Sequence, residues 1–218
     1  MTVPRRFIVG LLALGAENAY TDAVMRHTVP LQEALFTEIT GRLKQDDASV
    51  PYREDGYFYY TRFEPGKEYP IYCRRPGSLD AAEQVMLDGN ALAAGTGFFA
   101  VMGWSVSSGN DVLAFATDTV GRRIATLRFK SLTTGELFPD TIPEVTGNMA
   151  WANDNRTLFY SRQDLTTLRG YRIYRHTLGA DPAADALVFE ESDETYRCWV
   201  ERSKLMYAFL LDLAGITR

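Results

Sequence analysis

The sequence is poor in the residues that build metal centres and disulfide frameworks. Its 218 residues include two cysteines, Cys73 and Cys198, and two histidines, His27 and His176. Two cysteines without a CxxC spacing provide neither a disulfide framework nor a zinc or thioredoxin-like motif, so we expect buried free thiols. The histidines have no HExxH or similar ligand spacing. We therefore predict no metal site and no cofactor, and we expect His176 to be a surface residue at the end of a strand.

Clustered positive charge and long apolar runs are also missing. The formal net charge is −5, and no dense stripe of Lys and Arg is present. Because the phosphate backbone requires clustered cations, nucleic acids are not expected partners. The apolar run from Phe7 to Leu14 is far below the ~20 residues of a membrane-spanning helix. We expect a cytoplasmic protein in which residues 1–15 begin a helix; the alternative is a signal peptide, a periplasmic location and a mature chain that begins near Ala16.

The first part of the sequence has the pattern of a helix. From Ala16 to about Asp47 no strong turn signal appears until the approach to Pro51, and Pro30 suits a first helical turn. Apolar side chains then recur every fourth residue, at Leu31, Leu35, Ile39 and Leu43. This spacing predicts an amphipathic helix with one buried face.

From Pro51 onward the pattern changes to that of strands, and one unit recurs. Residues 106–116 align with residues 151–161 at an offset of 45 positions, which pairs the turn residues Asn110 and Asn155. The same offset places residues 126–130 on residues 171–175. Two segments that share one offset indicate a true internal repeat.

Looser copies of the unit begin near Gly56 and near Trp199. Short strands that repeat every ~45 to 55 residues are typical of propeller blades. The predicted fold is mainly β: a partial β-propeller of about three blades behind an α-helical amino-terminal segment. Because a closed ring typically takes four to eight blades, the chain forms an open array or belongs to something longer.

No catalytic constellation is recognisable from the residues alone. The segment from Gly103 to Ser107 places Ser105 where a nucleophile would stand, but it lacks the final glycine of a nucleophile elbow. The glycines near Gly95 lack the GK[ST] ending of a phosphate-binding loop. We therefore predict no catalytic, cofactor-binding or metal-binding residue in this chain.

Two further residue patterns have structural and functional interpretations. The pairs Arg74-Arg75 and Arg122-Arg123 are predicted to be solvated strand ends, with salt bridges to a neighbouring domain as the alternative. Aromatic residues are dense enough to suggest a stacking surface, although packing between blades explains them more simply. They include Tyr57, Phe58, Tyr59, Tyr60, Phe98, Phe99, Trp104 and Trp151.

Several long motifs resemble one family. They are AENAYTDAVM, RLKQDDASVP, GYFYYTRFEPGKEYPIYCRR, DTVGRR, TLRFKSLTTGE, WANDNRTLFY and GYRIYRHTLG. In this order, between Ala16 and Lys204, they resemble oligopeptidase B, a group of serine peptidases within the prolyl oligopeptidase family. The resemblance implies a helical segment and a seven-bladed propeller. It also implies that the propeller caps an α/β-hydrolase domain and admits only short peptides, which are cleaved after Lys or Arg.

The resemblance also sets the expected organisation of the chain. Residues 1–15 form a leader that does not match the family, residues 16–50 the helical segment, residues 51–204 the partial propeller and residues 205–218 a tail that does not match. In this family the catalytic Ser, Asp and His lie in the hydrolase domain, so no catalytic residue is carried over. The mismatched ends suggest a truncated reading frame.

Two functional hypotheses follow. In the first, the chain is the amino-terminal propeller fragment of a Lys/Arg-specific serine peptidase and is inactive alone; its partners are its own hydrolase domain and, through that domain, short basic peptides. In the second, it is a standalone propeller-like module that binds a peptide or protein at an open blade edge. Repeat arrays need polar caps, and the apolar sequence from Leu205 to Leu213 favours the first hypothesis.

Overall fold

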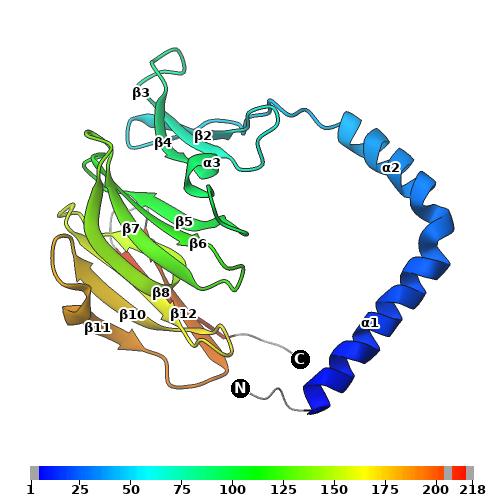
Figure 1. Cartoon of the computed structure of the whole chain (residues 1–218). Helices are drawn as coiled ribbons and strands as arrows, with labels where there is room; N and C mark the ends of the chain where they lie inside the picture. Colours follow the sequence, from blue (N-terminus) through cyan, green and yellow to red (C-terminus); the bar gives the residue numbers. More distant parts are fainter. Residues whose placement is uncertain (1–4, 204–207, 215–218) are drawn as a thin grey trace. The chain divides into compact units, whose positions relative to one another are not determined.

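The computed structural model describes residues 5–203 and 208–214, with side chains for residues 13–203, and divides the chain into the units Met1–Gln45 and Asp46–Arg218. The first unit is helical (Figure 1). It contains α1 (Arg5–Met25), the 3-10 turn η1 (Arg26–Thr28) and α2 (Val29–Gly41), with Pro30 in the first turn of α2. The helix thus begins before Ala16, as expected from the helix-favouring residues around that position.

The apolar stripe of α2 does not find a core in the structure. Leu31, Ile39 and Leu43 are 60%, 59% and 65% exposed, and the described residues of α2 include none that is buried. The prediction that this helix buries one face is therefore wrong. The stripe is an exposed apolar surface of the helical unit.

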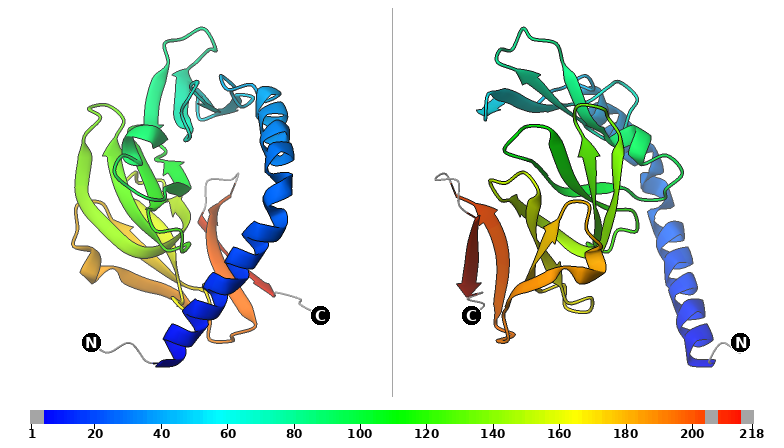
Figure 2. Two further views of the ribbon diagram at one scale, coloured as in Figure 1. Left: turned by 45° about the vertical axis from the view of Figure 1, so that its right-hand side comes forward. Right: turned by 90° about the vertical axis from the view of Figure 1, so that its left-hand side faces the viewer.

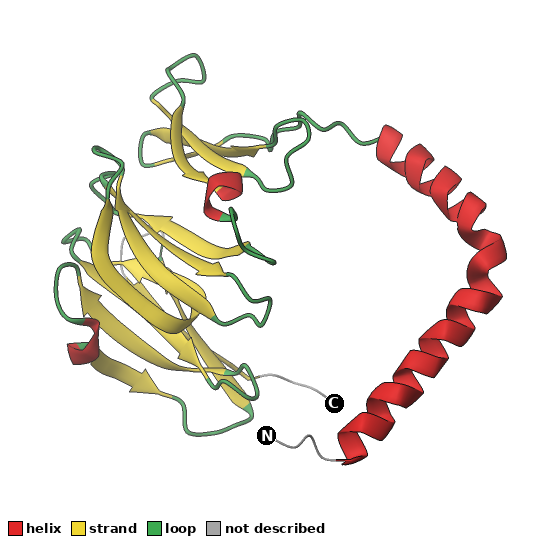
Figure 3. Cartoon of the chain, in the orientation of Figure 1, coloured by secondary structure: helices red, strands yellow, loops and turns green. Residues whose placement is uncertain are grey.

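The second unit is built from antiparallel strands, which confirms the mainly β prediction (Figure 3). The strands are β1 (Tyr52–Glu54), β2 (Tyr57–Arg62), β3 (Ile71–Pro76), β4 (Gln84–Asp88), β5 (Ala100–Val106), β6 (Val112–Asp118), β7 (Ala125–Ser131), β8 (Leu137–Trp151), β9 (Thr157–Gln163), β10 (Gly170–Thr177), β11 (Ala186–Glu190), β12 (Tyr196–Arg202) and β13 (Ala208–Ala214). Two short helical turns, α3 (Gly89–Leu92) and η2 (Pro182–Ala184), lie between strands.

The strands form three sheets in chain order: β1-β2-β3-β4, β5 to β11, and β12-β13 (Figure 2). Strand β8 belongs to two blades. Its first part pairs with β7, from Leu137 to Val145, and its last residues, from Met149 to Trp151, pair with β9. We therefore name β1–β4 blade 1, β5–β7 with the first part of β8 blade 2, the rest of β8 with β9–β11 blade 3, and β12–β13 the beginning of blade 4.

The strand boundaries confirm the internal repeat. Strand β6 runs from Val112 to Asp118 and β9 from Thr157 to Gln163, so both ends of β9 lie 45 residues after the corresponding ends of β6. The turn residues Asn110 and Asn155, predicted to be equivalent, both have a left-handed backbone, with φ of 62° and 57°. Asn tolerates a left-handed backbone better than most residues, which suits it to both turns.

Apolar side chains hold neighbouring blades together, as predicted for the aromatic residues. Between blades 1 and 2, a buried cluster joins Tyr59, Met86, Leu87, Leu113 and Phe115. A larger cluster unites blades 2 and 3. It includes Phe129 and Trp151, whose rings meet edge to face with centroids 5.9 Å apart. Each fully buried large side chain contributes roughly 1.5–3 kcal/mol through removal from water.

One close backbone approach fixes how blade 2 meets the shared strand β8. A Cβ placed on Gly103 of β5 would lie 2.1 Å from the carbonyl oxygen of Gly147 in β8, and one on Gly147 would lie 2.7 Å from the oxygen of Met102. Gly147 also has a φ of 101°. Glycine is required at both positions, because any side chain would push the two strands apart.

Four single-residue expectations have clear outcomes. Cys73 and Cys198 are buried and form no disulfide, as predicted. His176 is fully buried, so its prediction as a surface residue is wrong, and Arg74, at 3% exposure, is not a solvated strand end.

Within the tail predicted not to match the family, residues 208–214 form β13, which pairs with β12. The apolar positions 205–213 lie outside the residues whose side chains are described.

Candidate functional site

The strongest candidate site is a cavity of about 380 Å³ formed where β1, β5 and the end of β12 meet. We call it the inner-strand cavity, because it is lined mainly by the first strands of their blades and the turns that follow them. Its lining residues are Tyr52, Glu54, Asp55, Tyr59, Trp104, Ser105, Val106, Asn110 and Arg202.

Three aromatic rings form one wall of this cavity. Tyr52 stacks on Tyr59 with centroids 5.7 Å apart, and Tyr59 lies 5.7 Å from Trp104 at a tilted angle. The Tyr59 hydroxyl donates to Oδ1 of Asn110 over 3.3 Å, which ties blade 1 to the turn of blade 2. Burial, with the nearby charge of Glu54, raises the pKa of Tyr52 to about 12, so this hydroxyl stays neutral at physiological pH.

Charged groups complete the cavity. A guanidinium nitrogen of Arg202, at the end of β12, lies 3.3 Å from Oδ2 of Asp55. Asp55 sits in the turn between β1 and β2 with a φ of 44°, and its carbonyl oxygen accepts a hydrogen bond from Nδ2 of Asn110 over 3.2 Å. Blades 1, 2 and 4 therefore converge on this turn.

Ser105 lines the cavity but lacks the surroundings of a nucleophile. Its carbonyl oxygen accepts a hydrogen bond from Nε1 of Trp151 over 3.1 Å. Within the part of the chain whose side chains are described, no hydrogen bond joins the Ser105 hydroxyl to a histidine; His176 is occupied by the carboxylates of Asp140 in blade 2 and Asp185 in blade 3. A serine without a base is a weak nucleophile.

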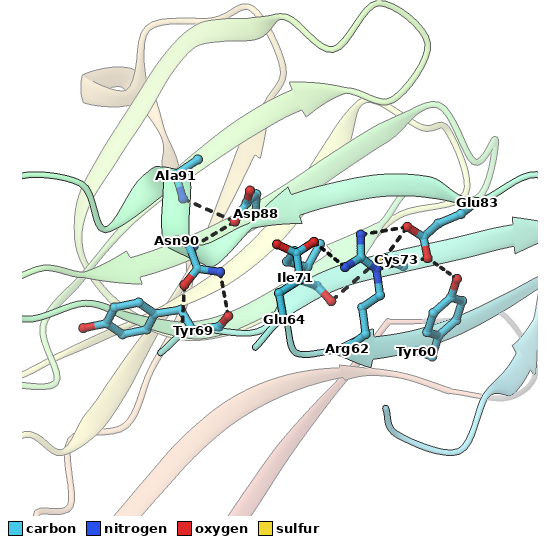
Figure 4. A network of polar contacts seen from close by, with 10 residues as sticks. All are labelled: Tyr60, Arg62, Glu64, Tyr69, Ile71, Cys73, Glu83, Asp88, Asn90 and Ala91. Atoms are coloured by element: carbon cyan, nitrogen blue, oxygen red, sulfur yellow. Dashed lines mark hydrogen bonds and ion pairs between the residues drawn. The ribbon is translucent and has the colours of Figure 1, made fainter. Parts of the chain in front are cut away.

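A charged network crosses blade 1 (Figure 4). Glu83 accepts hydrogen bonds from the Tyr60 hydroxyl over 2.5 Å and from the Arg62 guanidinium over 3.0 Å, while Arg62 also pairs with Glu64 at 2.7 Å. Burial alone would raise the pKa of Glu83, but the hydrogen bonds from Tyr60 and Arg62 hold this pKa below its usual value. Burial and the charge of Glu83 raise the pKa of Cys73 to about 11, so its thiol is unreactive.

A second group in Figure 4 fixes the connection from blade 1 to blade 2. The Asp88 carboxylate caps α3 by accepting from the backbone amides of Asn90 and Ala91. The Asn90 amide side chain in turn donates to the Tyr69 carbonyl over 2.8 Å and accepts from the Tyr69 amide over 3.0 Å. These contacts are structural, since they satisfy backbone groups at a helix start and a strand end.

His176 joins blades 2 and 3 through carboxylates. Its Nδ1 lies 2.7 Å from Oδ1 of Asp185 and its Nε2 lies 3.3 Å from Oδ1 of Asp140, and both carboxylates are almost fully buried. Tyr160 donates its hydroxyl to Asp185 over 2.8 Å. The imidazole also stacks on Phe129 at 5.4 Å. This network explains why a histidine that ends an amphipathic strand is buried: its polar atoms all find partners.

The two arginine pairs differ in their contacts and in their exposure to solvent. Arg74 lies with its guanidinium 4.1 Å from the centre of the Tyr57 ring, and Arg75 donates to the carbonyl oxygens of Leu79 and Ala81. Arg122 and Arg123 are exposed, as predicted for a strand end.

The edge of the blades where each first strand begins carries exposed apolar groups. Because the strands are antiparallel, the loops between second and third strands lie at this edge, where the chain also enters the unit from Gln45. Leu92, Phe98, Val120 and Leu165 are 37%, 42%, 67% and 49% exposed. We call this the entrance edge. A groove of about 360 Å³ lies in it between residues 121–124 and 165–168.

Sequence reasoning did not identify the cavity, the Arg202–Asp55 ion pair or the Glu83 network. Tyr52 and Glu54 are two residues apart on a strand, with Arg53 between them. This spacing alone indicates that Tyr52 and Glu54 share one face of the sheet. No local pattern connects them with Arg202. Among the described residues no cluster of His, Cys, Asp or Glu is placed to hold a metal, and no described helix is long and apolar enough to cross a membrane.

Comparison with known proteins identifies the family. Residues 14–210 match the family described as prolyl oligopeptidase, N-terminal beta-propeller domain. The chain is 49% identical over 209 residues to dipeptidyl aminopeptidase BI of Pseudoxanthomonas mexicana, covering 89% of this chain and 29% of that protein. It is 32% identical over 198 residues to protease 2 of Moraxella lacunata, covering 88% of this chain and 29% of that protein.

The solved structure of oligopeptidase B from Leishmania major superposes with a TM-score of 0.86 at 28% identity, covering 93% of this chain and 29% of that chain. The sequence thus spans less than a third of the length of these relatives, in which the propeller is joined to a catalytic hydrolase domain in one chain. The chain belongs to the prolyl oligopeptidase family, and its strands form the first blades of that family's amino-terminal propeller.

Proposed function

We propose that this chain is the propeller portion of an oligopeptidase B-like serine peptidase that cleaves short peptides after Lys or Arg, with the propeller limiting access to the catalytic site. The observation that carries this proposal is the match of residues 14–210 to the family's propeller domain. The likeness to oligopeptidase B at a TM-score of 0.86 supports it. The cleavage itself is assigned to a hydrolase domain that these 218 residues do not contribute.

The hydrolase domain is the proposed partner of the entrance edge. This edge combines exposed apolar side chains, such as Phe98 and Val120, with the exposed cations Arg122 and Arg123. Such a mixture is typical of an interface that is apolar in its centre and polar at its rim. The exposed stripe of α2 is a further apolar surface, in the helical unit.

The inner-strand cavity lies at the other ends of the first strands, next to the turns that follow them. A peptide that approaches along the first strands would meet this cavity before it reached the entrance edge. The charged surroundings of Asp55 and Arg202 support a role in contacting peptide substrates.

A second candidate activity is the release of dipeptides. The relative at 49% identity is named dipeptidyl aminopeptidase BI, whereas protease 2 is 32% identical. The two activities differ in whether the substrate must have a free amino terminus. Substrates with free and blocked amino termini therefore distinguish them.

The proposal is tested by complementation. Alone, the chain should neither hydrolyse an arginyl-arginyl reporter amide nor be labelled by a fluorophosphonate probe, because acyl transfer requires an activated nucleophile and an oxyanion hole. Added to the separately produced hydrolase domain of the Pseudoxanthomonas mexicana relative, it should bind that domain and alter its turnover of short peptides.

The Ser105→Ala variant is the matched control and should behave as the unaltered chain in both assays. Probe labelling that disappears in Ser105→Ala would contradict the proposal and identify an enzyme in its own right. Binding to an unrelated peptide without any effect on the hydrolase domain would favour the standalone binding module. A cytoplasmic location is part of the proposal, and recovery in a periplasmic extract would contradict that part.

A further inference from the structure

The inner-strand cavity contains more negative than positive charge. Its lining includes the carboxylates of Glu54 and Asp55 and one cation, Arg202. Arg202 pairs with Asp55 at 3.3 Å. Within the described side chains, Glu54 has no ion-pair partner.

The alternation of strand β1 accounts for this excess charge. Tyr52 and Glu54 line the cavity, whereas Arg53 between them lies with its guanidinium 6.0 Å from the centre of the Phe58 ring. Neighbouring residues on a strand point to opposite faces, so Arg53 is directed away from Glu54. The cation that is closest in sequence is thereby removed from the cavity.

The aromatic wall provides a surface for a flat cation. Elsewhere in the chain, arginines use tyrosine faces: Arg74 lies 4.1 Å from the centre of Tyr57, and Arg172 lies 4.7 Å from that of Tyr171. In the described part of the chain, the rings of Tyr52 and Trp104 have no Lys or Arg over them. A guanidinium is most stable where an aromatic face and a carboxylate act together.

The volume agrees with one small guest. Pockets for small ligands occupy ~300–1,000 Å³, and the cavity, at about 380 Å³, is at the lower end of this range. It can hold one charged head group and its aliphatic stem, but not a folded segment. The neutral hydroxyl of Tyr52 adds no competing charge.

We propose that the inner-strand cavity binds one organic cation of a peptide, a guanidinium or ammonium group, paired with Glu54 and packed against Tyr52 and Trp104. This inference goes beyond the proposed function, because it assigns ligand recognition to the propeller itself. Only its biological meaning, the selection of basic peptides on their way to a catalytic site, rests on that function.

The experiment is a calorimetric titration of the purified 218-residue chain at low salt. Nα-acetylarginine amide provides a guanidinium without a free amine, and Nα-acetylcitrulline amide is its neutral counterpart. We expect the arginine compound to bind at least about tenfold more tightly, and this advantage to shrink as salt is added. Equal binding of the two compounds, or no binding of either, would overturn the proposal if glycine amide, the ammonium probe described below, also failed to bind.

Variants locate the site. Glu54→Gln removes the unpaired carboxylate and should weaken binding of the arginine compound about tenfold. Glu194→Gln, an exposed carboxylate in the loop before β12, is the matched control and should leave binding unchanged. If Glu54→Gln binds as tightly as the unaltered chain, the cavity is not the site.

A second variant tests the site with a substitution that should leave the fold intact. Tyr52 is 48% exposed, so Tyr52→Leu should keep the far-ultraviolet circular dichroism of the chain. It should weaken binding roughly threefold to fivefold by removing the aromatic face. Unchanged affinity in Tyr52→Leu would contradict the part of the proposal that packs the cation against this aromatic wall.

A third compound, glycine amide, supplies an ammonium group from an amino terminus. Tighter binding of the arginine compound identifies the guest as a side chain, and tighter binding of glycine amide identifies it as an amino terminus; both support a cation site. No hydrolase domain is present in these titrations. Their failure would therefore leave the peptidase assignment standing, and failure of complementation would leave the cation site standing.

Discussion

The two interfaces between complete blades are built differently. Blades 2 and 3 share strand β8, approach closely at Gly103 and Gly147, and enclose the charged network of His176. Blades 1 and 2 are joined by a loop and by a stack of aromatic rings that borders an open cavity. The interface between blades 2 and 3 therefore uses its polar groups for stability, whereas the interface between blades 1 and 2 leaves charged groups accessible to a ligand.

Removing the tryptophan of each interface should lower the free energy of unfolding by different amounts. Trp151 is 1% exposed and donates its indole N–H across the interface between blades 2 and 3, so Trp151→Ala should lower the free energy of unfolding by about 3–5 kcal/mol. Trp104 is only half-buried, and Trp104→Ala should cost about 2 kcal/mol. Urea denaturation followed by circular dichroism measures both. Equal losses would contradict the proposed difference in packing.

The next effect concerns the buried network between blades 2 and 3. His176→Leu removes the imidazole between Asp140 and Asp185 and leaves these two buried carboxylates without their histidine partner. The free energy of unfolding should therefore fall by about 3 kcal/mol. The double variant His176→Leu with Asp185→Asn should recover part of this loss, because one buried charge is then removed. A double variant as unstable as the sum of the single ones would show that the groups do not interact.

A smaller, pH-dependent effect is expected in blade 1. Glu83→Gln should lower stability at neutral pH by about 1.5 kcal/mol, because the hydrogen bonds to its carboxylate are charge-assisted. The pKa of Glu83 is lowered in the folded state, so its contribution is present above the unfolded pKa and is lost as the pH falls through the folded pKa. The variant should therefore lose less stability than the unaltered chain between neutral pH and acid. If the free energies of unfolding of Glu83→Gln and of the unaltered chain changed in parallel with pH, this assignment would be contradicted.

The smallest effect concerns Arg202. Its side chain and that of Asp55 are 22% and 38% exposed, and pairs of this kind contribute at most about 1 kcal/mol. Arg202→Ala should therefore leave the unfolding midpoint in urea almost unchanged. The same variant should increase the affinity for Nα-acetylarginine amide, because Asp55 becomes available as a second carboxylate. Reduced affinity would show that Arg202 shapes the cavity instead of competing for it.

The fold was largely predictable from the sequence because each blade is a local unit. The repeat of 45 residues between Val112 and Thr157 follows from turn residues and strand alternation, which are properties of short segments. The burial of His176 and Arg74 was not predictable, since each depends on partners from another strand or blade. The inner-strand cavity was missed for the same reason: Asp55 and Arg202 are distant in sequence and meet only when blades 1 and 4 are in place.

The shared strand β8 has a consequence for how the propeller opens. Because β8 hydrogen-bonds to β7 at one end and to β9 at the other, blades 2 and 3 cannot separate without breaking one continuous ladder. Among the described residues, no strand ladder joins blade 1 to blade 2; side-chain contacts and the segment from Gly89 to Phe99 connect them. Amide hydrogen exchange should accordingly show blades 2 and 3 unfolding as one cooperative unit, while the seam beside the inner-strand cavity opens at lower free energy.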